Sequence, residues 1–316
     1  MKNRISIVIP VYNEEDNIKY LIDELQSFIQ NNPKYIFEVI MINDGSSDNT
    51  ENEVNKHKKD WLRIISFARN FGQTAALSAG FEAATGDIVV AMDGDLQNDT
   101  QEITKLLEKI EEGYDVVSGW RKNRKDRFLR VFMSNLANEI ISVVSGVRLH
   151  DFGCTLKAYK REFLKDIKLY GEMHRFIPIY SYWHGAKIAE VVVNHKPRVH
   201  GKSKYGMIRI FKVLLDLITI KYLGSYSTKP IYFFGGSGII LILSSLALFA
   251  VTIYQKIFLS VWVHRNPVFL LSIFLFIVGV QFLFFGLIAE IMIRTYYEST
   301  DTKTYRIRND TDKNNQ

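Results

Sequence analysis

Asp87-Ile88-Val89-Val90-Ala91-Met92-Asp93-Gly94-Asp95-Leu96-Gln97 joins a short apolar run to an acidic turn. The β-branched run predicts a buried strand, and the turn places the carboxylates of Asp93 and Asp95 at its end. In open α/β sheets, ligands bind at the carboxyl ends of the strands. A hard cation such as Mg²⁺ takes one or two carboxylates and completes its shell with water and phosphate oxygens. The pattern therefore indicates a cation site, and an ordinary polar turn is the alternative.

Strand and helix patterns alternate before this turn. Apolar runs predict strands at residues 4–10, 37–42, 63–68 and 87–92, and helical patterns follow the first three of them. Alternation of this kind is typical of a doubly wound, mostly parallel sheet. We therefore expect an α/β, Rossmann-like fold in this part of the chain.

Asn43-Asp44-Gly45-Ser46-Ser47-Asp48 follows the second predicted strand. A carboxylate here can accept hydrogen bonds from a base or ribose, so we predict that Asp44 contacts a nucleotide. A helix cap with no ligand is the alternative. The sequence has no Walker-type loop and no Gly-x-Gly-x-x-Gly motif, which argues against a P-loop kinase and a dinucleotide oxidoreductase.

Residues 231–254 and 268–289 contain no charged side chain. At about 1.5 Å per helical residue, either run can cross a hydrocarbon core of about 30 Å. We expect two transmembrane helices, because the alternative of two buried core helices needs more surrounding protein than the chain provides. Basic residues gather before the first run and after the second, which places both ends of the chain in the cytosol.

The sequence has 40 Lys and Arg residues against 34 Asp and Glu residues. Because the basic residues gather beside the apolar runs, we interpret the excess as attraction to lipid headgroups and phosphate groups, and we expect no nucleic-acid partner. Cys154 is the single cysteine, so an internal disulfide is excluded. This fits a reducing compartment.

Four motifs carry a family resemblance, and in chain order they are Ile9-Pro10-Val11-Tyr12-Asn13-Glu14, Asn43-Asp44-Gly45-Ser46-Ser47-Asp48, Arg69-Asn70-Phe71-Gly72 and Met92-Asp93-Gly94-Asp95-Leu96-Gln97. With the apolar hairpin, they resemble the polyprenyl-phosphate glycosyltransferases of family 2, the GT-A fold group of dolichol-phosphate mannose synthase. Residues 69–73, 96–98, 151–154 and 158–161 look most like those of the bacterial undecaprenyl-phosphate aminoarabinose-type sugar transferases. The resemblance covers nearly the whole chain.

The resemblance implies roles for particular residues. The implied nucleoside pocket contains Pro10, Tyr12, Glu14 and Asp44, and Asp93 also contacts the donor. A divalent cation, Mg²⁺ or Mn²⁺, is implied on the diphosphate, held by Asp93, Asp95 and Gln97. Asp95 and Asp151 are the implied catalytic residues. Two departures are Gly94, where alanine is usual, and Lys157, where arginine is frequent and could bind phosphate with two parallel bonds.

Four basic side chains are expected to attract the phosphate of the acceptor: Arg121, Arg124, Lys202 and Lys204. Solvated protein surface is the alternative. The expected plan is a cytosolic GT-A catalytic domain at residues 1–205, an amphipathic interfacial helix at 206–229, a membrane hairpin at 230–290 and a basic, polar cytosolic tail at 291–316.

We predict an inverting glycosyltransferase that moves a sugar from a nucleotide-sugar donor, taken as UDP-linked, to undecaprenyl or another polyprenyl phosphate. The expected location is the cytosolic face of the inner membrane, in a multi-pass protein that serves cell-envelope glycan synthesis or lipid A modification. The resemblance also implies a homotetramer, and a flippase is a candidate partner. The alternatives are a non-catalytic membrane scaffold or flippase partner that binds nucleotide sugar, and a processive polysaccharide synthase, whose Gln-x-x-Arg-Trp motif is absent here.

Overall fold

The chain forms two compact units, Met1–Leu217 and Ile218–Gln316, in a computed structural model. The structure describes residues 3–122, 138–165, 167, 169, 171, 173–196, 222, 226, 229–263 and 266–300. Three of the predicted acceptor residues, Arg124, Lys202 and Lys204, lie outside the described residues, as do most of the expected interfacial helix and the tail from residue 301.

One mixed sheet organises the first unit, in the order β3-β2-β1-β4-β6-β5-β7. Its strands are β1 (Arg4–Val11), β2 (Ile36–Asn43), β3 (Leu62–Ser66), β4 (Ile88–Ala91), β5 (Val116–Trp120), β6 (Lys157–Lys160) and β7 (Ile188–Val192). All neighbouring strands pair in parallel except β6, which runs antiparallel to both β4 and β5. The expected α/β fold with a mostly parallel sheet is therefore confirmed.

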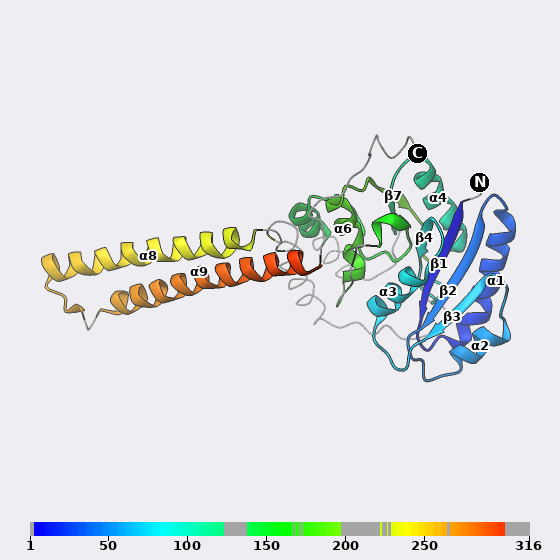
Figure 1. Cartoon of the computed structure of the whole chain (residues 1–316), viewed down its shortest axis with the longest axis horizontal. Helices are drawn as coiled ribbons and strands as arrows, with labels where there is room; N and C mark the ends of the chain where they lie inside the picture. Colours follow the sequence, from blue (N-terminus) through cyan, green and yellow to red (C-terminus); the bar gives the residue numbers. More distant parts are fainter. Residues whose placement is uncertain are drawn as a thin grey trace. The chain divides into compact units, whose positions relative to one another are not determined.

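Helices cover both faces of this sheet (Figure 1). Successive residues of a strand point to opposite faces, so Ile7 packs in the core with α1 and α4, and Val8 packs in the core with α3. Helix α3 approaches β1 closely, because a Cβ built on Gly80 would lie 2.1 Å from a methyl carbon of Val8. The α-helices whose bounds are described in this unit are α1 (Glu15–Asn31), α2 (Thr50–Lys56), α3 (Gln73–Ala83), α4 (Ile103–Glu111) and α6 (Ile177–Trp183), and residues 138–145 are also helical.

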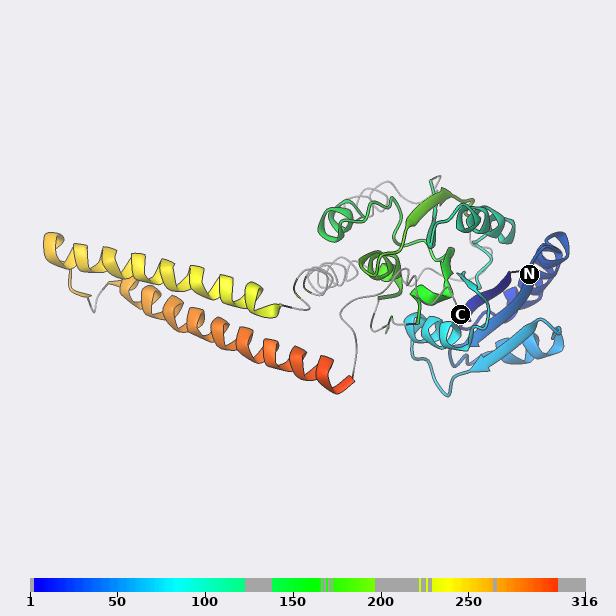
Figure 2. The same cartoon turned by 45° about the horizontal axis from the view of Figure 1, so that its top comes forward.

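Two long helices, α8 (Pro230–Leu259) and α9 (Pro267–Thr300), make up most of the described part of the second unit and lie side by side (Figure 2). Small residues allow their backbones to meet: a Cβ on Gly238 would lie 2.7 Å from the carbonyl oxygen of Gly279. The hydroxyl of Ser245 donates to the carbonyl of Ser272 over 2.7 Å. Both helices are long and apolar enough to cross a membrane, and they support association of the chain with a membrane.

Candidate active site

Loops from six strands meet at one edge of the sheet, the edge formed by the carboxyl ends of the parallel strands and the amino end of β6. Val11 pairs with Asn43 at the ends of β1 and β2, so the residues that follow, Tyr12 and Asp44, leave the sheet together. Because β6 is antiparallel, its first residue, Lys157, pairs with Ala91 at the end of β4. The loop that enters β6 therefore lies at the same edge as the loops that leave β1, β2, β4, β5 and β7. This edge carries the described residues that the sequence nominated for the site.

Asp93 is held from two sides immediately after β4. Its Oδ1 accepts from the side-chain amide of Gln73 over 2.7 Å, and its Oδ2 accepts from the hydroxyl of Thr155 over 2.6 Å. Burial and the neighbouring Asp95 carboxylate raise the pKa of Asp93 to about 6, although Thr155, Arg121 and Lys157 act in the opposite direction. A bound cation would relieve the repulsion between these two carboxylates, so the pair is suited to hold one.

Gln97 is bonded to its own turn and to a distant segment. Its backbone N–H donates to Asp95 Oδ1 over 3.2 Å, and its carbonyl accepts from the backbone N–H of Lys196 over 2.8 Å. The Gln97 Nε2 donates to the carbonyl of Lys196 over 3.4 Å. Residues 97 and 196 thus hold each other through both backbone and side chain, which fixes the end of the acidic turn.

The donor set of this turn fits a hard divalent cation. Asp93 and Asp95 offer carboxylate oxygens, and the side chain of Gln97 adds an amide oxygen, which are ligands suited to Mg²⁺ or Mn²⁺. Among the described residues, no three His, Cys, Asp or Glu side chains are grouped so that they could hold a metal alone. Phosphate oxygens of a substrate would complete the coordination shell of a cation held by this turn, as is common for Mg²⁺.

Asp44 is buried and organises the loop before α3. Its two oxygens accept from the backbone N–H groups of Phe71 and Gly72, over 2.7 and 2.9 Å. The next residue, Gly45, has φ +66°, and a Cβ there would lie 2.3 Å from the backbone of Arg69. Asp44 does not cap the helix that follows it, since Asp48 accepts from the first N–H of α2, that of Thr50. The structural role of Asp44 therefore lies in the loop before α3, while Asp48 of the same turn bonds the start of α2, and no observation tests the predicted contact of Asp44 with a nucleoside.

The loop after β1 is tied to the loop after β2. Asn13 has φ 55° and accepts from the backbone N–H of Ser47 over 2.8 Å, while its own N–H donates to the hydroxyl of Ser46 over 3.0 Å. Glu14 accepts from the side-chain amide of Asn17. These contacts fix the segment that carries the predicted donor residues Pro10, Tyr12 and Glu14 at the same edge as Asp44.

Asp151 and Arg121, predicted for different roles, form one buried ion pair. The guanidinium donates from Nε to Asp151 Oδ2 over 2.8 Å and from Nη2 to Oδ1 over 3.0 Å. The side chains are only 4% and 16% exposed. Although burial lowers it, the hydrogen bonds from Arg121 to Asp151 raise the pKa of the guanidinium above its ordinary value. Arg121 is therefore charged and oriented before any acceptor arrives.

Lys157 contacts the protein backbone. Its ammonium is buried and donates to the carbonyls of Phe152, over 3.1 Å, and Cys154. Burial lowers the pKa of Lys157 to about 8. The departure from arginine at this position thus concerns the loop that enters β6, where two carbonyls converge on a single ammonium.

Sequence reasoning missed three contributors to this edge. Gln73 and Thr155 hold Asp93, and Glu190 on β7 bonds the backbone of Asp151 over 3.1 Å. Gln73 follows the Arg69–Gly72 motif directly, which is a usable signal. Thr155 has no such signal, and Glu190 is marked only as a lone acid within the apolar run of residues 188–193.

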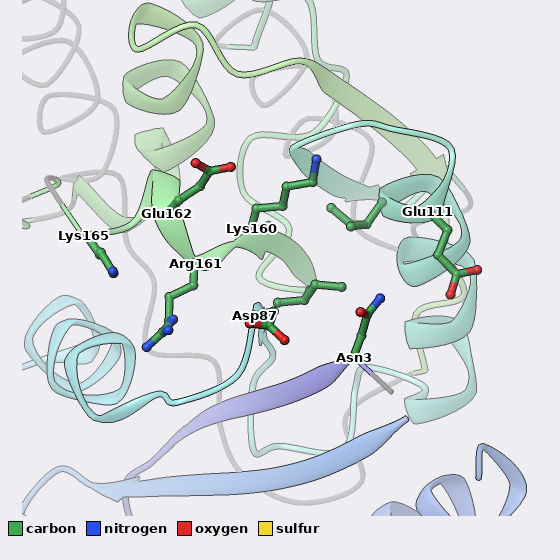
Figure 3. Close-up of a pocket in the computed structure, with 9 residues that line it drawn as sticks. Asn3, Asp87, Glu111, Lys160, Arg161, Glu162 and Lys165 are labelled. Atoms are coloured by element: carbon green, nitrogen blue, oxygen red, sulfur yellow. The ribbon is translucent and has the colours of Figure 1, made fainter. Parts of the chain in front are cut away.

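A separate cleft lies at the opposite edge of the sheet (Figure 3). Asp87 precedes β4, Lys160 ends β6 and Glu111 ends α4, so these lining residues face away from the acidic turn. The ammonium of Lys160 is already paired with Asp115 over 2.7 Å. This cleft contains none of the residues that the sequence nominated.

The chain is similar to known proteins over most of its length. The family model for glycosyl transferase family 2 matches residues 6–168. A dodecaprenyl-phosphate galacturonate synthase of Rhizobium johnstonii is 38% identical, and the match covers 96% of this chain and 92% of that protein. An undecaprenyl-phosphate 4-deoxy-4-formamido-L-arabinose transferase of Proteus mirabilis is 34% identical, with coverages of 97% and 93%.

Solved structures share the fold of the first unit. Glucosyl-3-phosphoglycerate synthase from Mycobacterium tuberculosis, crystallised with Mn²⁺, UDP and phosphoglyceric acid, has a TM-score of 0.56 at 20% identity, over 70% of this chain and 78% of that chain. Mannosyl-3-phosphoglycerate synthase from Rubrobacter xylanophilus has a TM-score of 0.56 at 16% identity, over 70% and 74%. At these identities the likeness shows the fold alone.

Proposed function

The chain belongs to glycosyl transferase family 2 and is an enzyme of sugar transfer, and from this premise we propose that it moves one sugar from a UDP-linked donor to the phosphate of a polyprenol. The expected GT-A catalytic fold is the one that its first unit adopts. We place the reaction at the cytosolic face of the inner membrane, with α8 and α9 as a membrane hairpin. The homotetramer is the part of the proposal that the family resemblance alone supports, and a flippase is a candidate partner.

The acceptor assignment is supported by the two relatives and the second unit. Both relatives are named for a polyprenyl phosphate, and each match covers more than nine-tenths of both chains. An acceptor of that kind is insoluble in water, and α8 and α9 are suited to keep the catalytic unit beside the membrane that contains it.

The donor assignment is supported by the acidic turn and by the loop around Asp44. A related fold is crystallised with UDP and Mn²⁺. In this chain, Asp93, Asp95 and Gln97 would hold a divalent cation on the diphosphate of the donor. When bound, that cation supplies Lewis-acid stabilisation of the departing diphosphate, which is worth several kcal/mol.

The reaction does not require a strong general base from the protein. A phosphate monoester has a second pKa of about 6, so the acceptor is mostly a dianion at neutral pH and has no proton to lose. One of its oxygens forms a bond to the anomeric carbon while the bond from that carbon to the diphosphate breaks, and UDP leaves with the electron pair. Attack opposite the leaving group inverts the anomeric centre.

The Asp151–Arg121 pair is the observation that best supports this mechanism. Both oxygens of Asp151 accept from Arg121, so the carboxylate is placed to orient the guanidinium of Arg121 rather than to remove a proton. The guanidinium keeps further N–H groups beyond the two that Asp151 binds. We propose that these meet the acceptor phosphate, which would otherwise be repelled by the acidic turn.

The names of the two relatives differ in the sugar, so the test uses several donors. Full-length protein in detergent is incubated with undecaprenyl phosphate, Mn²⁺ and either UDP-galacturonic acid, UDP-4-deoxy-4-formamido-L-arabinose, UDP-glucose or UDP-N-acetylglucosamine. We expect one donor to give a lipid product heavier by a single sugar, as measured by mass spectrometry. A ladder of products would indicate a processive synthase, and UDP binding without product from any donor would indicate a non-catalytic scaffold.

A further inference from the structure

Glu190 lies on β7, the edge strand of the sheet, and its side chain is 12% exposed. Its Oε1 accepts from the backbone N–H groups of His150 and Asp151, over 3.0 and 3.1 Å. Its Oε2 is 2.7 Å from Nδ1 of the His150 ring. One carboxylate thus binds two successive amides and a side chain at the start of the loop that leads into β6.

The same loop is held from a second side by Trp120, the last residue of β5. The indole of Trp120 stacks on the His150 ring with centroids 4.1 Å apart and an interplanar angle of 14°. Trp120 directly precedes Arg121, whose guanidinium binds Asp151. Neighbouring strands therefore position the two partners: Arg121 directly follows β5, and Glu190 on β7 accepts from the backbone N–H of Asp151.

We propose that Glu190 is a positioning residue for sugar transfer, which acts through Asp151 on Arg121. A carboxylate that accepts from consecutive backbone N–H groups fixes the direction of the residues that carry them. With the Asp151 backbone fixed, its two oxygens face Nε and Nη2 of Arg121, and the guanidinium is aimed before the acceptor binds. This role rests on the proposed function, whereas the anchoring of the loop can be tested without it.

The competing interpretation is that Glu190 only strengthens the sheet edge. Glu38 on β2 provides a matched control, because its Oε1 also accepts from two successive backbone N–H groups, those of Thr85 and Gly86, over 2.7 and 3.1 Å. Glu38 pairs with Ser6 toward the amino end of β1, at the opposite edge of the sheet from the acidic turn. Glu38→Ala and Glu190→Ala therefore remove similar bonds at opposite edges.

Cys154 provides a readout of the anchoring that is independent of activity. It is the single cysteine of the chain, it is fully buried, and it lies in the same loop as Asp151. The rate at which a thiol reagent labels Cys154 in the full-length protein therefore reports opening of this loop. We expect Glu190→Ala to raise that rate about tenfold, Glu190→Gln to raise it by less than about threefold, and Glu38→Ala to leave it unchanged.

Turnover with the active donor from the panel then tests the coupling to chemistry. We expect Glu190→Ala to lower kcat by about tenfold or more with little change in the affinity for UDP and Mn²⁺, and Glu190→Gln to recover most of the loss. In an Asp151→Asn background, Glu190→Ala should lower kcat no further, because it acts through Asp151.

Three results would overturn the proposal. The first is unchanged labelling of Cys154 in Glu190→Ala. The second is an equal fold-loss of kcat from Glu190→Ala with and without Asp151→Asn. The third is an equal loss of kcat in Glu38→Ala. If the wild type makes no lipid product with any donor, the proposed function fails, and the labelling experiment still decides whether Glu190 anchors the loop.

Discussion

The hydroxyl of Thr155 donates to Asp93 over 2.6 Å, so the loop entering β6 is bonded directly to the acidic turn that leaves β4. Thr155→Val removes this donor with little change in volume. Mutating a hydrogen-bond partner of a metal ligand typically weakens metal affinity by about 10- to 100-fold. If Asp93 binds the cation, we therefore expect the affinity for Mn²⁺ in the presence of UDP to fall by about tenfold. Paramagnetic resonance titration measures it. Thr155→Ser keeps the hydroxyl and should bind normally, and an equal loss in both variants would contradict this role.

Asp95 is the second carboxylate of the proposed cation site. We expect Asp95→Ala to lower transfer by about a hundredfold or more, because several kcal/mol of stabilisation of the leaving diphosphate depend on the cation. Excess EDTA should do the same to the wild type, and added Mn²⁺ should restore it. Asp60→Ala, at an exposed carboxylate outside the site, is the control. Full activity in EDTA would remove the cation from the mechanism.

Asp44 has a structural partner and a proposed ligand, and one pair of variants separates them. Asp44→Ala leaves the N–H groups of Phe71 and Gly72 without their acceptor and should cost about 2 to 4 kcal/mol of unfolding free energy. Asp44→Asn keeps one acceptor oxygen and should cost less. UDP affinity of the folded Asn variant, measured by calorimetry, then tests the nucleoside contact: wild-type affinity would limit Asp44 to its structural role.

Glu38 gives a pH dependence of stability with a definite sign. Burial raises its pKa, but hydrogen bonds from Ser6, Thr85 and Gly86 outweigh burial and lower it below the ordinary value. A carboxyl whose folded pKa is depressed stabilises the fold above its unfolded pKa, about 4.3, and loses that stabilisation as pH falls through the folded pKa. The gap in thermal stability between wild type and Glu38→Gln should therefore be constant from pH 7 to about pH 5 and shrink below that. A gap that widens in acid would reverse the assignment.

The membrane hairpin is expected to serve the long acceptor. A protein that ends before Pro230 retains Asp44 and the acidic turn, so we expect it to bind UDP and Mn²⁺ normally. Transfer to undecaprenyl phosphate in bilayers should fall steeply, while transfer to a short, water-soluble isoprenyl phosphate should fall much less. Product mass for both acceptors, in the truncated and full-length proteins, measures the difference. Equal losses on both acceptors would assign the helices to assembly instead of acceptor access.

The sequence predicted the parts of the fold that depend on local pattern. The β-branched runs of β1, β2 and β4 can be recognised directly in the sequence, and so can the acidic turn and the two apolar helices. Strand β6 is only Lys-Ala-Tyr-Lys, with charge at both ends, and nothing local indicates that it lies between β4 and β5 and runs against both. Its place is decided by pairing with strands that are distant in sequence.

Side-chain partners in the site were less predictable for the same reason. Arg121 and Asp151 are 30 residues apart, and each was assigned on its own to phosphate binding or catalysis. Lysine is rarely fully buried, so the position of Lys157 beneath the loop, with carbonyl partners, is not predictable from local pattern. The contact of Asp44 with a nucleotide stays a prediction, and its bonds to the loop at residues 71–72 depend on the parallel neighbours β2 and β3.

Because β6 runs antiparallel to β5, the segment between these two strands starts and ends at the same edge of the sheet. It leaves the sheet after Trp120 and returns at Lys157 on the same edge, where Arg121 and Asp151 join its two ends. A segment whose ends are fixed together can change in length or composition without altering the register of any strand, and the entropic cost of lengthening it grows only slowly. Changes in this segment can therefore be accommodated while the sheet itself stays the same.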